Sequence, residues 1–444
     1  MTLTDQNTFQ NYALNNRHRL LDHLPDDACV LVMSGEETIR NLDVDYPFRA
    51  QSDFFYLTAF TEPDSVLVLS KQQYVIFLRE KDAEKETWQG RRVGTDAAPE
   101  ALKVDRAFEV DLLEELLPEL VENSTNLFFS FTQLAQWSDV LQQIVSAAKA
   151  KSRQGVEAPH SFHDLDRVLH ELRLIKQPLE IEWMRQAAQM SVAGHKSAMQ
   201  AVQKLKTERQ LQGALENGFW QAGAYREAFN SICAGGENAC ILHYTENNQR
   251  LNATELVLVD AGAEYNFYAG DITTTFPIGG RFTEAQAQIY SLVLKAQKTV
   301  IEMVQPGVLY HELHEKTVRV LTEGLLELGI LQGDLETLIE EKACFTYFMH
   351  GTGHWLGMDV HDVGAYKVEK AWRPLEPGMV ITVEPGLYLS EQMADLDQKW
   401  HSIGVRIEDD VLVTETGYEV LTHGLPRTVQ EIEAYMAEFA EDGE

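Results

Sequence analysis

The sequence predicts an α+β protein built from two domains. Its 444 residues are enough for two or three domains and a sizeable hydrophobic core. Short apolar runs rich in β-branched residues indicate strands, and segments whose apolar residues recur every three or four positions indicate helices. In the longer C-terminal part the helices accompany neighbouring, hairpin-like strands, which favours an α+β domain over a doubly wound sheet.

The first third of the chain is expected to alternate strands with helices. The predicted strands are CVLVMS (29–34), SVLVLS (65–70) and YVIFL (74–78). Helices are predicted over 110–121 and 132–149. The polar stretch 151–164, in which Gly, Pro and charged residues cluster, is the predicted linker. We expect an N-terminal domain of residues 1–172 and a C-terminal domain of residues 173–444.

The C-terminal part is expected to combine long amphipathic helices with strands. One helix begins at Leu179. Another begins at Thr283, which has Gln286 at the capping-box spacing, and it is stopped by Pro306-Gly307. The predicted strands are 255–262, 271–279, 379–386 and 404–414.

Composition argues against several classes of partner and location. With 37 Lys and Arg against 69 Asp and Glu the net charge is −32, which repels phosphate backbones and anionic lipids. We therefore expect no binding to nucleic acid or membranes. The N-terminal segment lacks the apolar core of a secretion signal, and no apolar run approaches the roughly 18 residues of a membrane span. The four cysteines have no CxxC spacing, so we expect free thiols and a cytoplasmic protein.

Asp260 and Asp271 are the first candidate metal ligands. If 255–262 and the DITTTF run form a hairpin that turns at Tyr265-Asn266, the two aspartates lie directly opposite each other, roughly 5 Å apart. Two carboxylates that close remain ionised together only with a cation between them. A single aspartate at a strand end is usually a turn residue, and the opposed pair leaves a turn and a metal site about equally plausible.

Three histidines and two further acids extend this cluster. His350, His354 and His361 lie in HGTGHWLGMDVHD, whose glycines indicate a tight loop. They could bond to loop carbonyls, but imidazoles so near a carboxylate cluster favour metal binding. Glu384 ends an apolar strand before Pro385-Gly386, and Glu408 shares a strand face with Arg406. Four carboxylates with one imidazole suit two divalent ions such as Mn²⁺.

Two other motifs are interpreted as structural. His311 and His314 in HELHE lie three residues apart on a predicted exposed helix, so we do not interpret them as metal ligands. GGEN (235–238) has no Lys-Ser/Thr continuation, so it is not interpreted as a phosphate loop.

The five candidate ligands resemble, in chain order, those of the pita-bread metallopeptidases, and the flanking segments look most like the aminopeptidase P group. The matching residues are Asp260, Asp271, His354, Glu384 and Glu408. The matching segments include 241–247, 260–277, 350–364, 375–388, 404–410 and, in the N-terminal third, 46–60 and 88–92. The resemblance thus spans nearly the whole chain. Thr274 stands where an Arg is expected, which could change the lining of the site, and Thr352-Gly353 varies within the histidine loop.

The resemblance implies a fold, an activity and a set of roles. It implies a curved antiparallel sheet backed by helices, a creatinase-like N-terminal domain, and a dimer or tetramer. The implied activity is release of the N-terminal residue before proline. Two divalent ions, by preference Mn²⁺, would be bridged by Asp271 and Glu408, with Asp260 on one ion and His354 and Glu384 on the other.

The same resemblance assigns roles to residues around the metals. Glu384 would also carry protons, His243 and His361 would hold substrate, and His350 would shape the proline pocket. The implied substrate-binding residues are Tyr388, Arg406, Asp43, Arg153 and Trp88. The rival interpretations are a prolidase, restricted to dipeptides, and a metal-free binding module, against which the complete ligand set argues.

Overall fold

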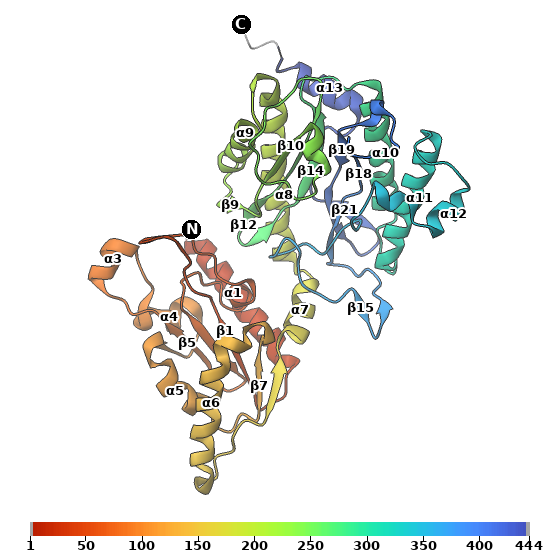
Figure 1. Ribbon diagram of the computed structural model, residues 1–444. Coiled ribbons are helices and arrows are strands. Elements are labelled where there is room, and N and C mark those ends of the chain that lie inside the picture. Colours follow the sequence, from red (N-terminus) through yellow and green to blue (C-terminus); the bar gives the residue numbers. More distant parts are fainter. Residues whose placement is uncertain (1–2, 441–444) are drawn as a thin grey trace. The chain divides into compact units, whose positions relative to one another are not determined.

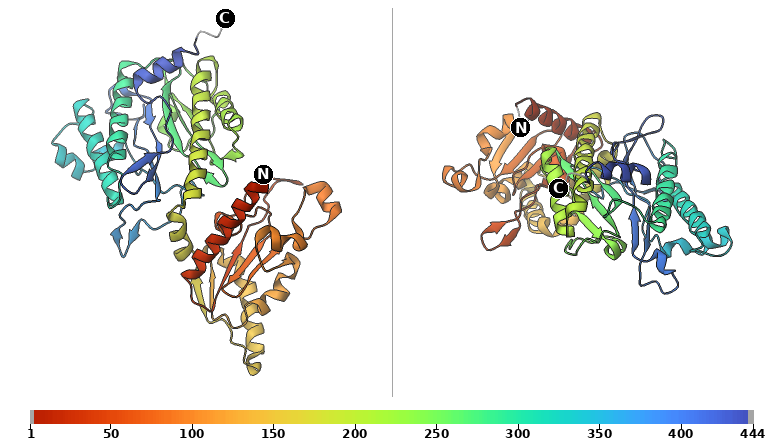
Figure 2. Two further views of the ribbon diagram at one scale, coloured as in Figure 1. Left: turned by 180° about the vertical axis from the view of Figure 1, so that it is seen from behind. Right: turned by 90° about the horizontal axis from the view of Figure 1, so that it is seen from above.

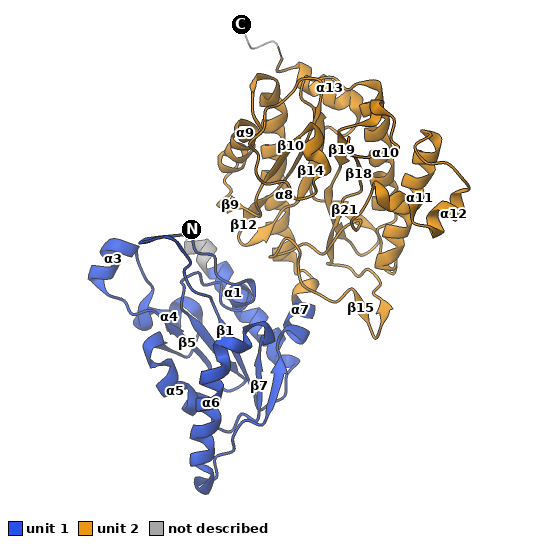
Figure 3. Ribbon diagram, in the orientation of Figure 1, with its two compact units in different colours: residues 1–172 blue, residues 173–444 orange. Residues whose placement is uncertain are grey.

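The computed structural model describes residues 3–440 and divides the chain into two compact units, residues 1–172 and 173–444 (Figures 1 and 3). Each unit has its own sheets and its own hydrophobic core. Within residues 3–440 no helix combines the length and the apolar character that crossing a membrane requires.

Unit 1 contains one six-stranded sheet and a small hairpin. Its strands are β1 (Ala28–Met33), β2 (Ile39–Asn41), β3 (Val44–Asp45), β4 (Val66–Ser70), β5 (Tyr74–Leu78), β6 (Arg106–Glu109), β7 (Asn126–Phe129) and β8 (Ser161–Asp164). Its helices are α1 (Leu3–Asp22), α2 (Ser52–Thr58), α3 (Ala83–Gln89), α4 (Gly94–Leu102), α5 (Leu113–Leu120), α6 (Leu134–Ala150) and α7 (Asp166–Leu174), which runs on into unit 2.

Both faces of the six-stranded sheet are covered. The strand order is β6-β5-β4-β1-β7-β8, and β1 pairs antiparallel with β4 and parallel with β7. Leu117, Trp137 and Ile144 of α5 and α6 pack against one face. Helix α1 lies over the other face, as the view from behind shows (Figure 2). Strands buried on both faces explain why the runs at 29–34 and 74–78 are continuously apolar.

The predicted linker at 151–164 is wrong. Ser152–Gln154 form a short 3₁₀-helix, and Ser161–Asp164 form β8, which pairs in parallel with β7. Strand β8 is the last in the sheet, and an edge strand tolerates polar side chains that a central strand would have to bury. Because the side chains of β8 are mostly polar, the composition of this segment did not indicate a strand.

Unit 2 contains several short antiparallel sheets and six further helices. Its strands are β9 (Arg226–Glu227), β10 (Ile232–Gly235), β11 (Leu256–Ala261), β12 (Ala263–Tyr265), β13 (Tyr268–Ala269), β14 (Ile272–Pro277), β15 (Lys367–Val368), β16 (Ala371–Trp372), β17 (Val380–Val383), β18 (Gly386–Leu389), β19 (Ile403–Arg406), β20 (Asp409–Val413) and β21 (Tyr418–Val420). Its helices are α8 (Pro178–Ala201), α9 (Glu208–Gln221), α10 (Glu284–Ile301), α11 (Tyr310–Glu327), α12 (Leu335–Glu340) and α13 (Val429–Ala437).

The strands of unit 2 lie between two groups of helices, with α8 and α9 on one side and α10 and α11 on the other (Figure 1). The main sheets have the orders β10-β11-β14, β17-β20-β21 and β18-β19. A core that includes Phe219 of α9, Phe276 of β14 and Ile289 of α10 joins helices to strands. Antiparallel strands packed against helices confirm the predicted α+β class.

The β11–β14 hairpin has a different register from the predicted one. Asp260 pairs with Thr273, not with Asp271, because the tight turn lies at Asn266-Phe267, one residue later than expected. Both turn residues have positive φ, 50° and 72°, as a two-residue hairpin turn of type I′ requires. The slip amounts to two positions along the partner strand, so side chains keep their face of the sheet and Asp271 remains on the face of Asp260.

Two segments predicted as single strands are each broken at an acid. Glu384-Pro385 separates β17 from β18, and Ile407-Glu408 separates β19 from β20. Proline has no N–H to donate to a ladder, which explains the first break. At the second break the Glu408 N–H donates instead to the Thr273 carbonyl of β14. These two breaks place a carboxylate from each strand pair in the interior of unit 2.

Candidate metal centre

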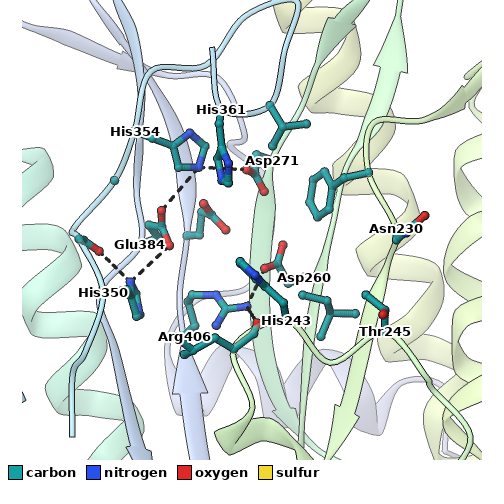
Figure 4. A pocket seen from close by; sticks show the side chains of 17 residues that line it. Asn230, His243, Thr245, Asp260, Asp271, His350, His354, His361, Glu384 and Arg406 are labelled. Atoms are coloured by element: carbon teal, nitrogen blue, oxygen red, sulfur yellow. Dashed lines mark hydrogen bonds and ion pairs between the residues drawn. The ribbon is translucent and has the colours of Figure 1, made fainter. Parts of the chain in front are cut away.

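A cavity of 530 Å³ opens in unit 2 where the broken strands meet β11 and β14. Its lining contains all five predicted metal ligands together with His243, His350, His361 and Arg406 (Figure 4). Phe229, Ile232 and Leu242 form an apolar part of the wall. Residues more than 100 positions apart in the chain thus converge on one space, within the range typical of small-molecule sites.

Three predicted ligands are within reach of one ion. Asp271, His354 and Glu408 each offer an atom within 4.8 Å of the others. His354 Nε2 lies 3.5 Å from Asp271 Oδ2 and 3.6 Å from Glu384 Oε1, so Glu384 adjoins the same group (Figure 4). Thr273 donates to Glu408 Oε2 at 2.7 Å and fixes that carboxylate.

The two carboxylate oxygens of Asp260 have different surroundings. Arg406 donates to Asp260 Oδ2 at 2.6 Å. The other oxygen, Oδ1, is buried and has no hydrogen-bond partner within residues 3–440. An unpartnered buried carboxylate oxygen is costly, and a bound cation would satisfy it.

The electrostatics of the cluster call for a cation. Burial raises the pKa of Glu408 well above its usual range, and the Asp271 carboxylate raises it further. Burial likewise raises the pKa of Asp271 and of Glu384. Burial lowers the pKa of His354, but hydrogen bonding and charge from Asp271 outweigh this and raise it to about 9. The protein alone therefore keeps protons in the cluster, and a divalent ion would replace them. The donor set fits such an ion.

His350 lies at the opposite end of the cavity from Asn230 and Thr245 (Figure 4). Its Nδ1 lies 2.7 Å from the Gly351 carbonyl, so Nδ1 carries the proton and Nε2 accepts from Tyr388 Oη at 2.7 Å. Burial and the charge of Arg406 lower the pKa of His350 to about 3, so the ring is neutral. Arg406 donates to Tyr388 Oη at 2.8 Å. Tyr388 is buried behind the cavity wall and holds His350 in place.

His243 and His361 line the cavity without joining the ligand group of Asp271, His354 and Glu408. The His361 ring packs edge-on against the His354 ring, 4.4 Å between centroids. Burial lowers the pKa of His361, and the neighbouring His354 lowers it further. A neutral imidazole here can donate or accept a hydrogen bond to a bound substrate.

A buried ion cluster anchors the segment that carries His361. The next residue, Asp362, accepts from Lys176 Nζ at 2.9 Å and from Arg173 Nη2 at 2.8 Å, and all three side chains are buried. Burial raises the pKa of Asp362, but the two cations outweigh this and hold it below its usual value. The last turn of α7 and the residues directly after it therefore position the histidine loop.

We expect Asp362→Asn to destabilise the protein by about 3 kcal/mol, because two buried cations lose their counter-charge. The measurement is the free energy of unfolding from denaturant titration. The control is Asp359→Asn: Asp359 bonds Arg173 at 2.7 Å but its side chain is 39% exposed, so a loss below about 1 kcal/mol is expected. Equal losses for the two variants would contradict the role assigned to Asp362.

Several predicted site residues lie elsewhere. Asp43 lies between β2 and β3, Trp88 lies in α3, and Arg153 lies in the 3₁₀-helix after α6; all three are exposed in unit 1 and none lines the cavity. Their role in substrate binding stays a prediction. The expectation that Thr274 could change the lining of the site is wrong. Thr274 is buried on the far face of β14 and bonds His195 of α8 at 2.8 Å.

The structure adds residues that the sequence did not single out. Thr382 accepts the His354 N–H at 3.0 Å and contacts Glu384 Oε1 at 3.3 Å. Asp410 accepts the Asp271 N–H at 3.2 Å. Thr382 stands two residues before Glu384, and Asp410 stands two residues after Glu408, so period-two spacing along a strand was the available signal.

Comparison with known proteins agrees with this geometry. The family described as Metallopeptidase family M24 matches residues 182–415, and Aminopeptidase P, N-terminal domain, matches residues 13–128. The Xaa-Pro aminopeptidase of Haemophilus influenzae is 44% identical over 95% of this chain and 96% of its own.

Two solved structures are similar over their whole length. The Pseudomonas aeruginosa aminopeptidase PepP has a TM-score of 0.94 and 42% identity, covering 97% of this chain and 98% of its own. Escherichia coli aminopeptidase P with the inhibitor Pro-Leu has a TM-score of 0.93 and 40% identity, with the same coverage. The predicted resemblance and two-domain fold class are thereby confirmed.

Proposed function

The chain belongs to metallopeptidase family M24, and we propose that its buried acid–histidine cluster holds two divalent metal ions. The protein is a metalloaminopeptidase that releases the N-terminal residue from peptides with proline in the second position. The observation that carries the proposal is the buried group of Asp271, His354 and Glu408 with Glu384 beside it.

Five residues would hold these ions: Asp260, through its unpartnered Oδ1, together with Asp271, His354, Glu384 and Glu408. Oxygen donors outnumber the single imidazole, which favours Mn²⁺ over softer metals. When bound, the ions supply Lewis acidity toward the scissile carbonyl and toward a water molecule.

Glu384 is the proton carrier of the reaction. Its carboxylate lines the cavity and its pKa is raised by burial, which suits a group that accepts a proton and then returns it. It takes the proton of the attacking water and delivers it to the departing proline nitrogen. His361 and His243 donate hydrogen bonds to the substrate and to the oxyanion that develops at the carbonyl.

The cavity orients the peptide from its apolar wall toward His350. The first residue lies against Phe229, Ile232 and Leu242, and the proline ring packs beside neutral His350. Tyr388 and Arg406 keep that imidazole in one tautomer through the 2.7 and 2.8 Å bonds described above.

The roles proposed for unit 1 concern longer substrates. We infer that Asp43, Arg153 and Trp88 serve the far end of the substrate in a dimer or tetramer, and that the enzyme works in the cytoplasm. Three exposed side chains outside the cavity of unit 2 support a role that involves a second subunit.

A paired assay tests the choice between aminopeptidase and prolidase. We expect Xaa-Pro-Xaa tripeptides to be cleaved faster than matched Xaa-Pro dipeptides when Mn²⁺ is added, because a second cavity adjoins the metal cavity at His350 and leaves room for a residue after proline. Release of the first residue is measured by chromatography. Faster cleavage of the dipeptide would identify a prolidase, and inert substrates with metal bound would favour a binding module.

A further inference from the structure

A second cavity of 330 Å³ adjoins the metal centre in unit 2. Its wall is formed by the start of α11, the 345–353 segment, β17 and Trp372 of β16. It shares His350, Gly351 and Gly353 with the metal cavity. The two spaces are therefore neighbours across one glycine-rich loop.

The motif HELHE lies in this wall, contrary to the expected exposed helix face. His311 and His314 are half-buried in the first turns of α11, and both line the second cavity. The His311 ring stacks on the Trp372 indole, 5.3 Å between centroids and 14° between planes. His314 bonds Thr352 at 3.0 Å, and burial lowers its pKa.

The lining has the character of a site for an uncharged aromatic group. Tyr310, Phe345 and Trp372 add three aromatic rings to the histidines. No Asp, Glu, Lys or Arg is among its lining residues within the described part of the chain, although Lys367 Nζ lies 4.2 Å from the centroid of the Trp372 ring. Met349 and Trp372 are 45% and 37% exposed, so the rim is open to solvent and a peptide could pass it.

The order of the lining residues along the metal cavity indicates which part of a bound peptide reaches the second cavity. In Figure 4 Asn230 and Thr245 lie at one end of the metal cavity and His350 lies at the other. Under the proposed function the second residue, proline, packs at His350. The residue after proline is then the first whose side chain can enter the cavity on the other side of that histidine.

We propose that the second cavity binds the side chain of the substrate's third residue and selects aromatic side chains there. This inference rests on the proposed function. It names a preference beyond the required proline, and it gives the HELHE motif a role in peptide recognition.

The test compares Ala-Pro-Phe with Ala-Pro-Gly in the Mn²⁺-loaded full-length enzyme. We expect the wild type to cleave Ala-Pro-Phe with the higher kcat/KM, and Trp372→Ala to reduce the ratio of the two values about fivefold. Using a ratio removes any general loss of activity. Trp372→Phe should keep most of the preference. Val368→Ala, a truncation in β15 of the same hairpin at a side chain outside both cavities, should leave the ratio unchanged.

Inhibition by dipeptides gives a second readout without turnover. Pro-Phe should inhibit more strongly than Pro-Gly, and Trp372→Ala should remove that difference. If the wild type cleaves both tripeptides but with equal kcat/KM, or if Trp372→Ala keeps the wild-type ratio, the second cavity is not this subsite while the proposed function stands. If neither tripeptide is cleaved with metal bound, the proposed function fails and this inference fails with it.

Discussion

Replacing Glu384 with glutamine is expected to leave the fold intact and to reduce turnover by about 10²–10⁴-fold. Glutamine has the same size, so the packing between β17 and β18 is preserved. An amide cannot accept a proton from water and return it to the proline nitrogen. The measurement is kcat on a Xaa-Pro-Xaa tripeptide at matched metal content, with circular dichroism to monitor the fold.

The matched control is Glu376→Gln, the same exchange at an exposed glutamate that precedes β17. Glu376 pairs with Arg373 at 3.1 Å, a surface contact of small energetic value, so wild-type turnover is expected. A Glu384→Gln enzyme that binds its metal and turns over at the wild-type rate would show that another group carries the proton.

The convergence of the metal centre could be predicted because its ligands follow short, recognisable runs. Asp260 ends an apolar strand, and Glu384 stands directly before Pro385-Gly386. An acid that follows an apolar run needs a partner, so the pattern marks these residues as candidates even where the exact strand ends were missed. All five predicted ligands line one cavity as a result.

The exact pairing of the strands could not be predicted from the same patterns. Period-two alternation predicts which face of the sheet a residue occupies. It does not distinguish two strand registers that differ by two positions, because both leave each side chain on the same face. The register depends on Asn266-Phe267 as the turn pair, and phenylalanine is an unusual residue at positive φ. A Cβ atom at position 262 would lie 1.6 Å from the Gly270 carbonyl oxygen, so only glycine fits at position 262.

Contacts between segments that are far apart in the chain also could not be predicted from the sequence. The Arg406–Asp260 pair joins residues 146 positions apart, and the anchor of His361 through Asp362 depends on Lys176, 186 positions away. Charged residues are common on surfaces, so composition does not distinguish a buried partner from a solvated one. Only the packed structure shows that these ions are enclosed.

Asp271→Asn is expected to lose metal and activity together. Asp271 lies within reach of both His354 and Glu408, and an amide removes the negative charge from the centre of the cluster. Replacing even an outer-shell partner typically costs 10–100-fold in metal affinity, so we expect a loss of more than about 100-fold here. Isothermal titration with Mn²⁺ and elemental analysis of the purified protein measure it.

Asp410→Asn separates loss of a ligand from disturbance of the buried cluster. Asp410 accepts the Asp271 N–H but lies outside the cavity lining, and an amide oxygen can accept the same hydrogen bond. This variant should keep its metal content and most of its activity. Excess Mn²⁺ should restore part of the turnover of Asp271→Asn, because mass action refills a weakened site but cannot repair a misfolded one. Equal metal loss in the two variants, or no recovery with added Mn²⁺, would remove Asp271 from the ligand set.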